Sequence, residues 1–211
     1  MKPLVIVGSG GFAREVLDVV EAINAVQERW NFLGFLDDHK SEDPLVTSRG
    51  AAILGPSQLL TELACEYVIA IADPAARERI DTLATGAGRE AATLVHPGAT
   101  IGSVNSISPG LIATAGSCVT TNVQIGRHVH LNLGSTVGHD VVLGPYVTIN
   151  PGAHISGNVT LEDGVTIGTG ASVIQGLKVG RRSFVGAGAV VTKDVAPGLV
   201  VVGIPARPLA R

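Results

Sequence analysis

A six-residue repeat occupies the second half of this chain and constrains its fold more than any other feature. From Val95 to Val191 every sixth residue is aliphatic: sixteen of these seventeen positions hold Val, Ile or Leu, and the exception is Ala113. No insertion interrupts the phase. In seven hexads glycine follows the aliphatic residue, at Gly102, Gly126, Gly138, Gly144, Gly168, Gly180 and Gly186. A repeat of this regularity indicates a solenoid rather than an ordinary globular core.

The period also defines the shape of each repeat. Six residues match neither the 3.6-residue turn of an α-helix nor the two-residue alternation of a strand. The first and fifth residues of each hexad are mostly apolar or small, which suits a short extended side that points inward and then turns. Glycine suits the corner because it tolerates positive φ. Three sides close a coil of about 18 residues, so residues 95–196 are predicted to form a parallel β-helix of roughly five to six coils stacked about 4.8 Å apart.

The front of the chain, residues 1–93, has a different pattern. An apolar run over 4–7 predicts a buried strand, and a glycine-rich turn leads from it into an amphipathic helix over 14–26. Two more strands are predicted over 32–36 and 67–72, with a helix beginning near 77–83. This alternation predicts a parallel, Rossmann-like domain for substrate or nucleotide, followed by a β-helix domain over 94–211.

The glycine turn of the front domain carries a possible phosphate site. Residues 8–13 match the pattern G-x-G-x-x-A, which places backbone N–H groups at the start of a helix, where they can bind phosphate. Asp37 or Asp38 follows the next strand, where a ribose-binding acid belongs. A purely structural tight turn is the alternative. A full dinucleotide site is not expected, because this short domain lacks a second βαβ half.

Charge and cysteine content exclude several classes. The first 93 residues hold 8 basic and 14 acidic side chains and the rest hold 7 and 4, so an acidic front half argues against nucleic-acid binding. Cys65 and Cys118 lie in different predicted domains, which favours free thiols in a reducing compartment. Neither a signal peptide nor a membrane span is predicted, so we expect a cytoplasmic protein.

The whole chain resembles the NeuD-type bacterial sugar acyltransferases of the hexapeptide-repeat superfamily. These include sialic acid O-acetyltransferases and nucleotide-sugar N-acetyltransferases. The segments that carry the resemblance are residues 7–16, 35–38, 70–74, 96–97, 132, 138–140 and 202–207. The resemblance implies a left-handed β-helix and a homotrimer with active sites between neighbouring β-helices. It also implies acetyl-CoA in the groove between them, with the front domain binding a sugar acceptor, usually nucleotide-linked.

The resemblance implies His139 as the general base, which takes a proton from a sugar amine or hydroxyl as it attacks the thioester. Asp140 would orient that imidazole, which requires residues 138–140 to turn because adjacent side chains of a straight strand point to opposite faces. By itself, a corner histidine is more often an ordinary surface residue. Asn132 matches an active-site asparagine of the family. It also lies one predicted coil before Asn150, and such a pair often forms a structural amide ladder.

Cofactor and substrate positions follow in the same way. Gly157 lies one predicted coil after His139, so the wall beside the base would have no side chain and a thioester could approach. The positions expected to contact CoA are Thr148, Gly157, Thr169 and Ala187, with Lys193 and Arg207 either facing its phosphates or simply solvated. The positions expected to contact the acceptor are Gly10, Gly11, Phe12, Asp37, Asp38 and Ala72.

Two departures from the family keep a second hypothesis open. Relatives often carry His where Thr148 stands, and some carry His where Phe12 stands. The chain could therefore be a non-catalytic trimeric protein, either one that binds a nucleotide sugar or a regulatory protein. A third hypothesis, a zinc hydratase, would need His128 or His130 to converge with His139 across an interface. We expect no metal.

Overall fold

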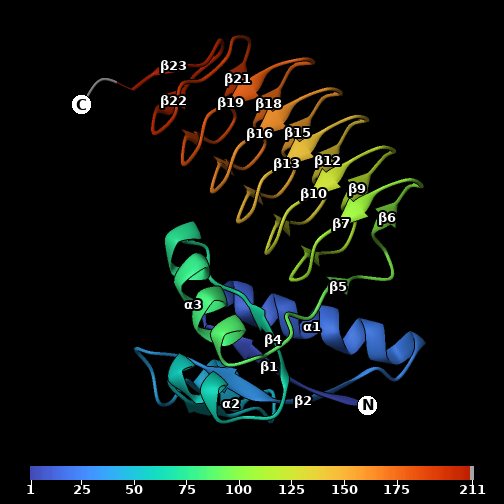
Figure 1. Ribbon diagram of the computed structural model, residues 1–211, viewed down its shortest axis with the longest axis vertical. Helices are drawn as coiled ribbons and strands as arrows, with labels where there is room; N and C mark the ends of the chain where they lie inside the picture. The colour runs from blue at the N-terminus through green and yellow to red at the C-terminus, as the bar shows by residue number, and fades with distance from the viewer. Residues whose placement is uncertain (210–211) are drawn as a thin grey trace. The chain divides into compact units, whose positions relative to one another are not determined.

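The computed structural model describes residues 1–209, which form two compact units. The first unit spans Met1–His96 and the second begins at Pro97. Figure 1 shows a small layered domain of helices and strands followed by a long stack of coils. Within the described residues, no helix is both long enough and apolar enough to cross a membrane.

The first unit is built on a four-stranded parallel sheet in the order β3-β2-β1-β4. Its strands are β1 (Lys2–Val7), β2 (Trp30–Leu36), β3 (Ile53–Gly55) and β4 (Glu66–Ile69). Its other elements are α1 (Gly11–Val26), α2 (Pro44–Thr47), the 3₁₀ helix η1 (Ser57–Thr61), α3 (Pro74–Gly86) and β5 (Leu94–Val95). The Rossmann-like prediction is confirmed.

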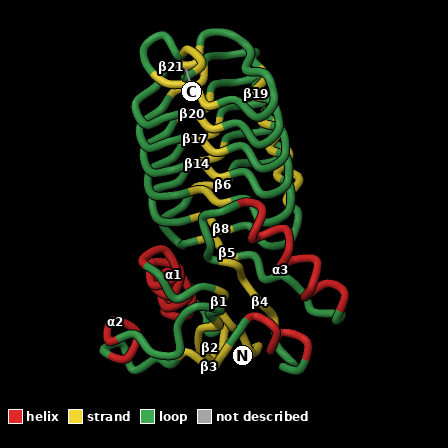
Figure 2. The backbone as a smooth tube through the Cα atoms, turned by 90° about the vertical axis from the view of Figure 1, so that its left-hand side faces the viewer, coloured by secondary structure: helices red, strands yellow, loops and turns green. Residues whose placement is uncertain are grey.

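Alternating side chains of β1 supply the core on both faces of this sheet. Val5 and Val7 pack with Leu60 of η1 and Ile80 of α3, while the intervening Ile6 points to the other face and is fully buried. Figure 2 shows α1 and α3 on opposite sides of β1 and β4. A helix on each face places the carboxyl ends of β1 and β4 at a topological switch point, where open α/β sheets bind ligands.

The second unit consists of short strands that pair across successive coils (Figure 2). One face holds β7 (Ser106–Ile107), β10 (Gln124–Ile125), β13 (Val142–Leu143), β16 (Thr160–Leu161) and β19 (Lys178–Val179). Another holds β6 (Thr100–Ile101), β9 (Cys118–Val119), β12 (Thr136–Val137), β15 (His154–Ile155), β18 (Ser172–Val173) and β21 (Val190–Val191). The third holds β8 (Ile112–Ala113), β11 (His130–Leu131), β14 (Thr148–Ile149), β17 (Thr166–Ile167), β20 (Phe184–Val185), β22 (Val200–Val202) and the antiparallel β23 (Arg207–Pro208).

The register of these strands follows the repeat. Val137 pairs with Val119 in the preceding coil and with Ile155 in the next, which is a step of three hexads in each direction. All three side chains are at least 98% buried, so the aliphatic position of every third hexad stacks on itself inside the coil. The second unit is thus a left-handed parallel β-helix, as predicted.

The corners differ from our prediction in one respect. The glycines that follow the aliphatic position do not have positive φ; left-handed backbone occurs two residues later. The corners of successive coils stack into three edges of the β-helix. Edge 1 holds the left-handed residues Val104, Asn122, Asp140, Asn158 and Gly176. Edge 2 holds Gly110, His128, Tyr146, Gly164, Arg182 and Gly198, and edge 3 holds Gly116, Gly134, Gly152, Gly170 and Gly188. The glycines allow close approach instead, since a Cβ on Gly138 would lie 2.7 Å from the backbone nitrogen of Gly157.

Candidate active site

A histidine and an aspartate meet at edge 1, directly after β12. His139 Nδ1 and Asp140 Oδ2 lie 2.8 Å apart. The contact is possible because Asp140 has a φ of 59°, a left-handed conformation that Asp and Asn adopt more readily than other non-glycine residues. This turn brings two adjacent side chains to the same side. Both are about half exposed, so the imidazole is accessible from outside the coil.

Asn122, one coil earlier on the same edge, supports the carboxylate. Its Nδ2 donates a hydrogen bond of 3.3 Å to Asp140 Oδ1, while Oδ2 contacts the imidazole. The hydrogen bonds from His139 and Asn122 lower the pKa of Asp140 below its ordinary value. An ionised Asp140 makes His139 Nδ1 the donor and leaves Nε2 as the basic nitrogen. No sequence motif marks Asn122, although a step of one coil back from Asp140 leads to it.

Gly157 lies against the imidazole from the next coil. A Cβ at this position would be 2.5 Å from both Cε1 and Nε2 of His139. We expected this empty wall to admit a thioester. The imidazole itself occupies the space, so the missing side chain makes room for the ring of His139.

Asn132 lies away from this group, two residues before the left-handed Gly134 of edge 3. It forms the predicted amide ladder: its Nδ2 donates to Asn150 Oδ1 at a long 3.4 Å, and Asn150 Nδ2 donates to the Ile167 carbonyl at 2.9 Å. Asn132 is 93% buried, and its Oδ1 accepts no hydrogen bond from the described residues. A buried acceptor of this kind normally has a partner.

The positions expected to contact CoA are divided between edges. Thr169 and Ala187 are exposed and directly precede the left-handed Gly170 and Gly188 of edge 3. Lys193 follows β21, whose Val191 pairs with Val173, so it continues the corner column of edge 1 that contains His139 and Gly157. At about 4.8 Å per coil, Lys193 is about 14 Å from His139 along this edge.

Two further positions expected to contact CoA lie elsewhere. Thr148 is buried within β14, where it pairs with His130 of β11 and Thr166 of β17. Arg207 is exposed in β23, and its guanidinium donates to the Ala206 carbonyl. Neither is brought next to His139 by a contact within the chain.

A separate cavity of about 420 Å³ lies at the carboxyl ends of the strands in the first unit. It is lined by Gly8, Ser9 and Gly10 after β1, by Asp37, Asp38 and His39 after β2, by Ser57, by Ala70 and Ile71 after β4, and by Ala76 and Arg79 of α3, among others. Gly8 has a φ of +99°, which residues with a side chain rarely adopt, and a Cβ there would lie a tight 3.0 Å from the Ala70 carbonyl oxygen.

The amino terminus of α1 opens beside the glycine turn. Asp43 and Asp73 cap α2 and α3 with their side chains, whereas α1 begins after Gly10 with no side-chain cap. An uncapped first turn leaves backbone N–H groups directed out of the helix, where they attract anions. Phe12 lies half-buried in this first turn.

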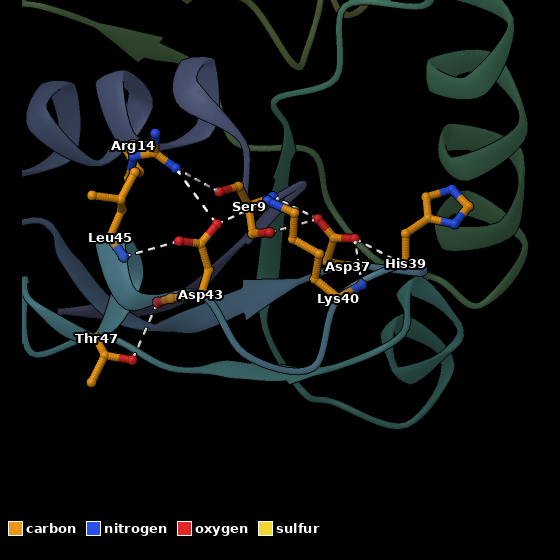
Figure 3. Close-up of polar contacts among 8 residues, drawn as sticks. All are labelled: Ser9, Arg14, Asp37, His39, Lys40, Asp43, Leu45 and Thr47. Carbon is orange, nitrogen blue, oxygen red and sulfur yellow. Dashed lines mark hydrogen bonds and ion pairs between the residues drawn. The ribbon is translucent and has the colours of Figure 1, made fainter.

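The other residues expected to contact the sugar acceptor, Asp37, Asp38 and Ala72, have hydrogen-bond partners within the chain. Asp37 accepts hydrogen bonds from Ser9 and from the backbone that follows it (Figure 3), and Asp38 accepts from Ser57. Ala72 is exposed beyond β4, and its carbonyl accepts a 2.9 Å hydrogen bond from Arg77.

The histidines of the β-helix are dispersed within one chain. His128 is buried at edge 2 and stacks on Tyr146, whereas His139 lies at edge 1. Within residues 1–209, no three His, Cys, Asp or Glu side chains are grouped closely enough to hold a metal ion.

Comparison with known proteins places the chain in a family. The PglD N-terminal domain family matches residues 3–82. The structure of WeeI from Acinetobacter baumannii AYE is 34% identical, with 99% of this chain and 100% of that one covered and a TM-score of 0.89. The acetyltransferase domain of PglB from Neisseria gonorrhoeae FA1090, solved with acetyl coenzyme A, is 32% identical, with 99% of each chain covered and a TM-score of 0.89. The chain belongs to the NeuD-type nucleotide-sugar acyltransferases.

Another similar structure contains CoA together with a nucleotide sugar. Perosamine N-acetyltransferase from Caulobacter crescentus, in complex with CoA and GDP-perosamine, is 25% identical over 100% of this chain and 98% of that one, with a TM-score of 0.92. In that crystal one histidine of the enzyme is replaced by asparagine. No curated protein gave a significant match.

Proposed function

We propose that this acyltransferase moves an acetyl group from acetyl-CoA to an amine of a nucleotide-linked sugar, with His139 as the general base. The observation that carries the proposal is the His139–Asp140 contact at an exposed corner, with the imidazole over Gly157. An exposed imidazole has no structural need for an oriented carboxylate and a missing side chain beside it. A catalytic base needs both orientation and access.

The chemistry follows from these two side chains. His139 Nε2 takes a proton as the amine attacks the thioester carbonyl carbon, so that the C–N bond forms while charge develops on the carbonyl oxygen. Asp140 stabilises the imidazolium that results. The C–S bond then breaks, and the proton held by His139 passes to the leaving thiolate. Backbone N–H groups at the groove would stabilise the oxyanion.

The cavity of the first unit is the proposed site for the nucleotide part of the acceptor. Gly10 precedes the uncapped α1 and Gly11 is its first residue, which suits the diphosphate, and Phe12 and Ala72 lie at the same end of the sheet. Phe12 cannot donate a hydrogen bond, so it would contact the acceptor by packing alone. The GDP-perosamine complex of the Caulobacter relative supports this substrate class.

We propose a homotrimer whose cofactor groove is shared by two chains. His139, Gly157 and Lys193 lie along edge 1, whereas Asn132 and Thr169 belong to edge 3, so edge 1 of one protomer would face edge 3 of the next. The surface of the β-helix also exposes apolar side chains that a trimer interface would bury, at Leu133, Ile174 and Phe184. Light scattering should give three times the 21.5 kDa protomer mass.

The proposed compartment is the cytoplasm. Cys65 and Cys118 are free thiols in different units, as suits a reducing environment. Fractionation of the native host would test this location.

The test of catalysis is replacement of the base. His139→Ala should reduce thiol release from acetyl-CoA by about 100- to 10,000-fold with UDP-, GDP- and dTDP-linked amino sugars as acceptors. His154→Ala is the matched control, because His154 is another exposed β-helix histidine, and its ring contacts Thr136 rather than a carboxylate. Undiminished turnover would remove His139 from the mechanism. Nucleotide-sugar binding without acetyl-CoA affinity at millimolar concentration would instead favour the non-catalytic alternative.

A further inference from the structure

Two adjacent carboxylates at the end of β2 have different hydrogen-bonding states. Asp37 Oδ2 accepts from the backbone N–H and the Oγ–H of Ser9, at 3.0 and 2.7 Å. Its Oδ1 accepts from the backbone N–H groups of His39 and Lys40, at 2.9 and 3.2 Å. Each oxygen of an ionised carboxylate accepts about two hydrogen bonds, so Asp37 has no acceptor capacity left for a ligand.

The neighbouring Asp38 is only half used. Its Oδ1 accepts from the Ser57 backbone N–H at 2.7 Å, and its Oδ2 accepts from Ser57 Oγ at 3.0 Å. Each oxygen therefore keeps one lone-pair site. Asp38 is exposed and lines the cavity, so both sites can face a bound molecule.

Ser9 is held at every polar group it has. Asp37 takes its N–H and its hydroxyl, and its carbonyl oxygen accepts a 3.2 Å hydrogen bond from the guanidinium of Arg14. Figure 3 shows Ser9 between these two side chains. Ser9 is also fully buried and directly precedes Gly10 and Gly11. The glycine turn thus cannot shift unless the contacts between Ser9 and Asp37 break.

The ionisation of Asp37 agrees with this arrangement. Partial burial by itself would raise the pKa of Asp37, but the hydrogen bonds from Ser9, His39 and Lys40 outweigh it and lower the pKa below the ordinary 3.8. The carboxylate is therefore charged at neutral pH and can accept from all four donors.

We infer that Asp37 is a positioning residue, which acts through Ser9 to hold the N–H groups of the glycine turn on the diphosphate. Asp38 is then the carboxylate that contacts the nucleoside. This inference rests on the proposed function, because it takes the cavity as the site of the nucleotide. The sequence leaves open whether Asp37 or Asp38 is the acid that contacts the ribose, and this inference assigns that contact to Asp38.

Because Asp37 is charged, the direction in which its replacement changes the affinity for anions distinguishes two explanations. A carboxylate near a diphosphate repels it, so removing the charge should by electrostatics alone strengthen anion binding. If Asp37 instead positions the turn, the same replacement weakens anion binding. The two explanations therefore predict opposite changes in one measured affinity.

The experiment measures binding of UDP, GDP and inorganic pyrophosphate by calorimetry to the full chain. Asp37→Asn should weaken binding of all three probes by about tenfold, because an amide cannot accept from all four donors. Ser9→Ala should weaken them less, by about threefold. Asp38→Asn should weaken UDP and GDP but leave pyrophosphate, which has no nucleoside, unchanged or slightly tighter. Glu15→Gln removes one exposed charge from α1 and controls for net charge.

Several outcomes would overturn the inference. Pyrophosphate bound by D37N as tightly as by the unsubstituted protein would show that Asp37 does not act through the turn. Weaker pyrophosphate binding by D38N would contradict the division of roles. If D37N fails to fold, pyrophosphate binding by S9A is compared with that of the unsubstituted protein instead, because this variant removes only a hydroxyl.

A second measurement separates this inference from the proposed function. If the unsubstituted protein binds neither UDP nor GDP, the proposed nucleotide site is wrong. Amide hydrogen exchange over residues 9–11 then still tests the positioning role without any ligand. Exchange should be faster in D37N and S9A and unchanged in D38N, and equal rates in all variants would overturn it.

Discussion

The imidazole of His139 lies over the Cα of Gly157, one coil further along the β-helix. A Cβ at position 157 would be 2.5 Å from Nε2, closer than real side chains approach. The corner column that contains both residues carries side chains at Thr121 and Gln175, so only the coil that follows His139 lacks one at this corner. The local backbone alone does not demand glycine there, because φ at Gly157 is not positive. The ring position of His139 is what demands it.

Gly157→Ala should therefore disable the base without unfolding the chain. The added methyl must push the imidazole away from its present position, and a displacement of about 1 Å in an active site can cost about 100-fold in rate. We expect kcat for acetyl transfer to fall by about 10- to 100-fold, with little change in thermal unfolding.

Gly86→Ala is the control, because a Cβ there meets nothing within 4 Å. It should leave kcat unchanged. A fully active G157A enzyme would mean that the imidazole works from a position other than the one over Gly157.

Asn122 should contribute to catalysis through Asp140. Asn122→Gly removes the amide that bonds the carboxylate yet keeps a residue that tolerates the φ of 58°. Loss of one hydrogen bond to a charged group should lower kcat by about 3- to 10-fold and leave KM for acetyl-CoA unchanged. Steady-state kinetics at neutral pH measure this split.

Asn158→Gly provides a matched comparison for that experiment. Asn158 has a φ of 56° on the same edge, one coil beyond Asp140, and it contacts His139 through its backbone N–H, which glycine retains. Equal losses in both variants would mean that the corner conformation matters, and that the Asn122 amide does not.

Acid should weaken the fold partly through Asp37. Hydrogen bonds lower its pKa below the ordinary 3.8, so the stability it contributes is complete above that pH and is lost as pH falls through the lower folded value. Urea unfolding at pH 5 and at pH 3 should show a smaller drop in unfolding free energy for Asp37→Asn than for the unsubstituted protein. An identical drop in both would show that Asp37 has the same pKa in the folded and unfolded chain.

The sequence predicted those features that depend on a repeated local pattern. The aliphatic positions of the hexad mark the inward side chains, so the place of Val137 inside the coil follows from its position in the repeat alone. Contacts between side chains of successive coils were harder to predict from the sequence. The bond between Asn122 and Asp140 joins residues in successive coils, and only a step of one full coil connects them.

Other features depend on packing that no local pattern encodes. The carboxylate of Asp37 can accept its full set of hydrogen bonds only with Ser9, which lies a whole helix and strand earlier in the chain. The two residues meet because β1 and β2 pair so that Val7 lies beside Leu36. Similarly, the glycines after the aliphatic positions suggested positive φ, whereas their function is close approach between neighbouring coils. Both depend on distances between segments, which residue type alone does not specify.

Lys193 should bind the phosphates of acetyl-CoA. It lies on the same edge as His139, about 14 Å away at the strand spacing, and no described residue forms an ion pair with it. Lys193→Met should raise KM for acetyl-CoA by about 3- to 10-fold with little change in kcat, as expected for loss of one exposed charge contact. S-acetylpantetheine has no phosphates, so its KM should not change.

The comparison of two thioesters makes this prediction specific to the phosphates. Lys178→Met removes another exposed charge, one that is already paired with Glu162, and should leave both KM values unchanged. A rise in KM for S-acetylpantetheine in K193M would mean that Lys193 shapes the groove near the acyl group. No rise for acetyl-CoA would mean that the phosphates lie elsewhere, and Arg207, on β23, would then be the next residue to replace.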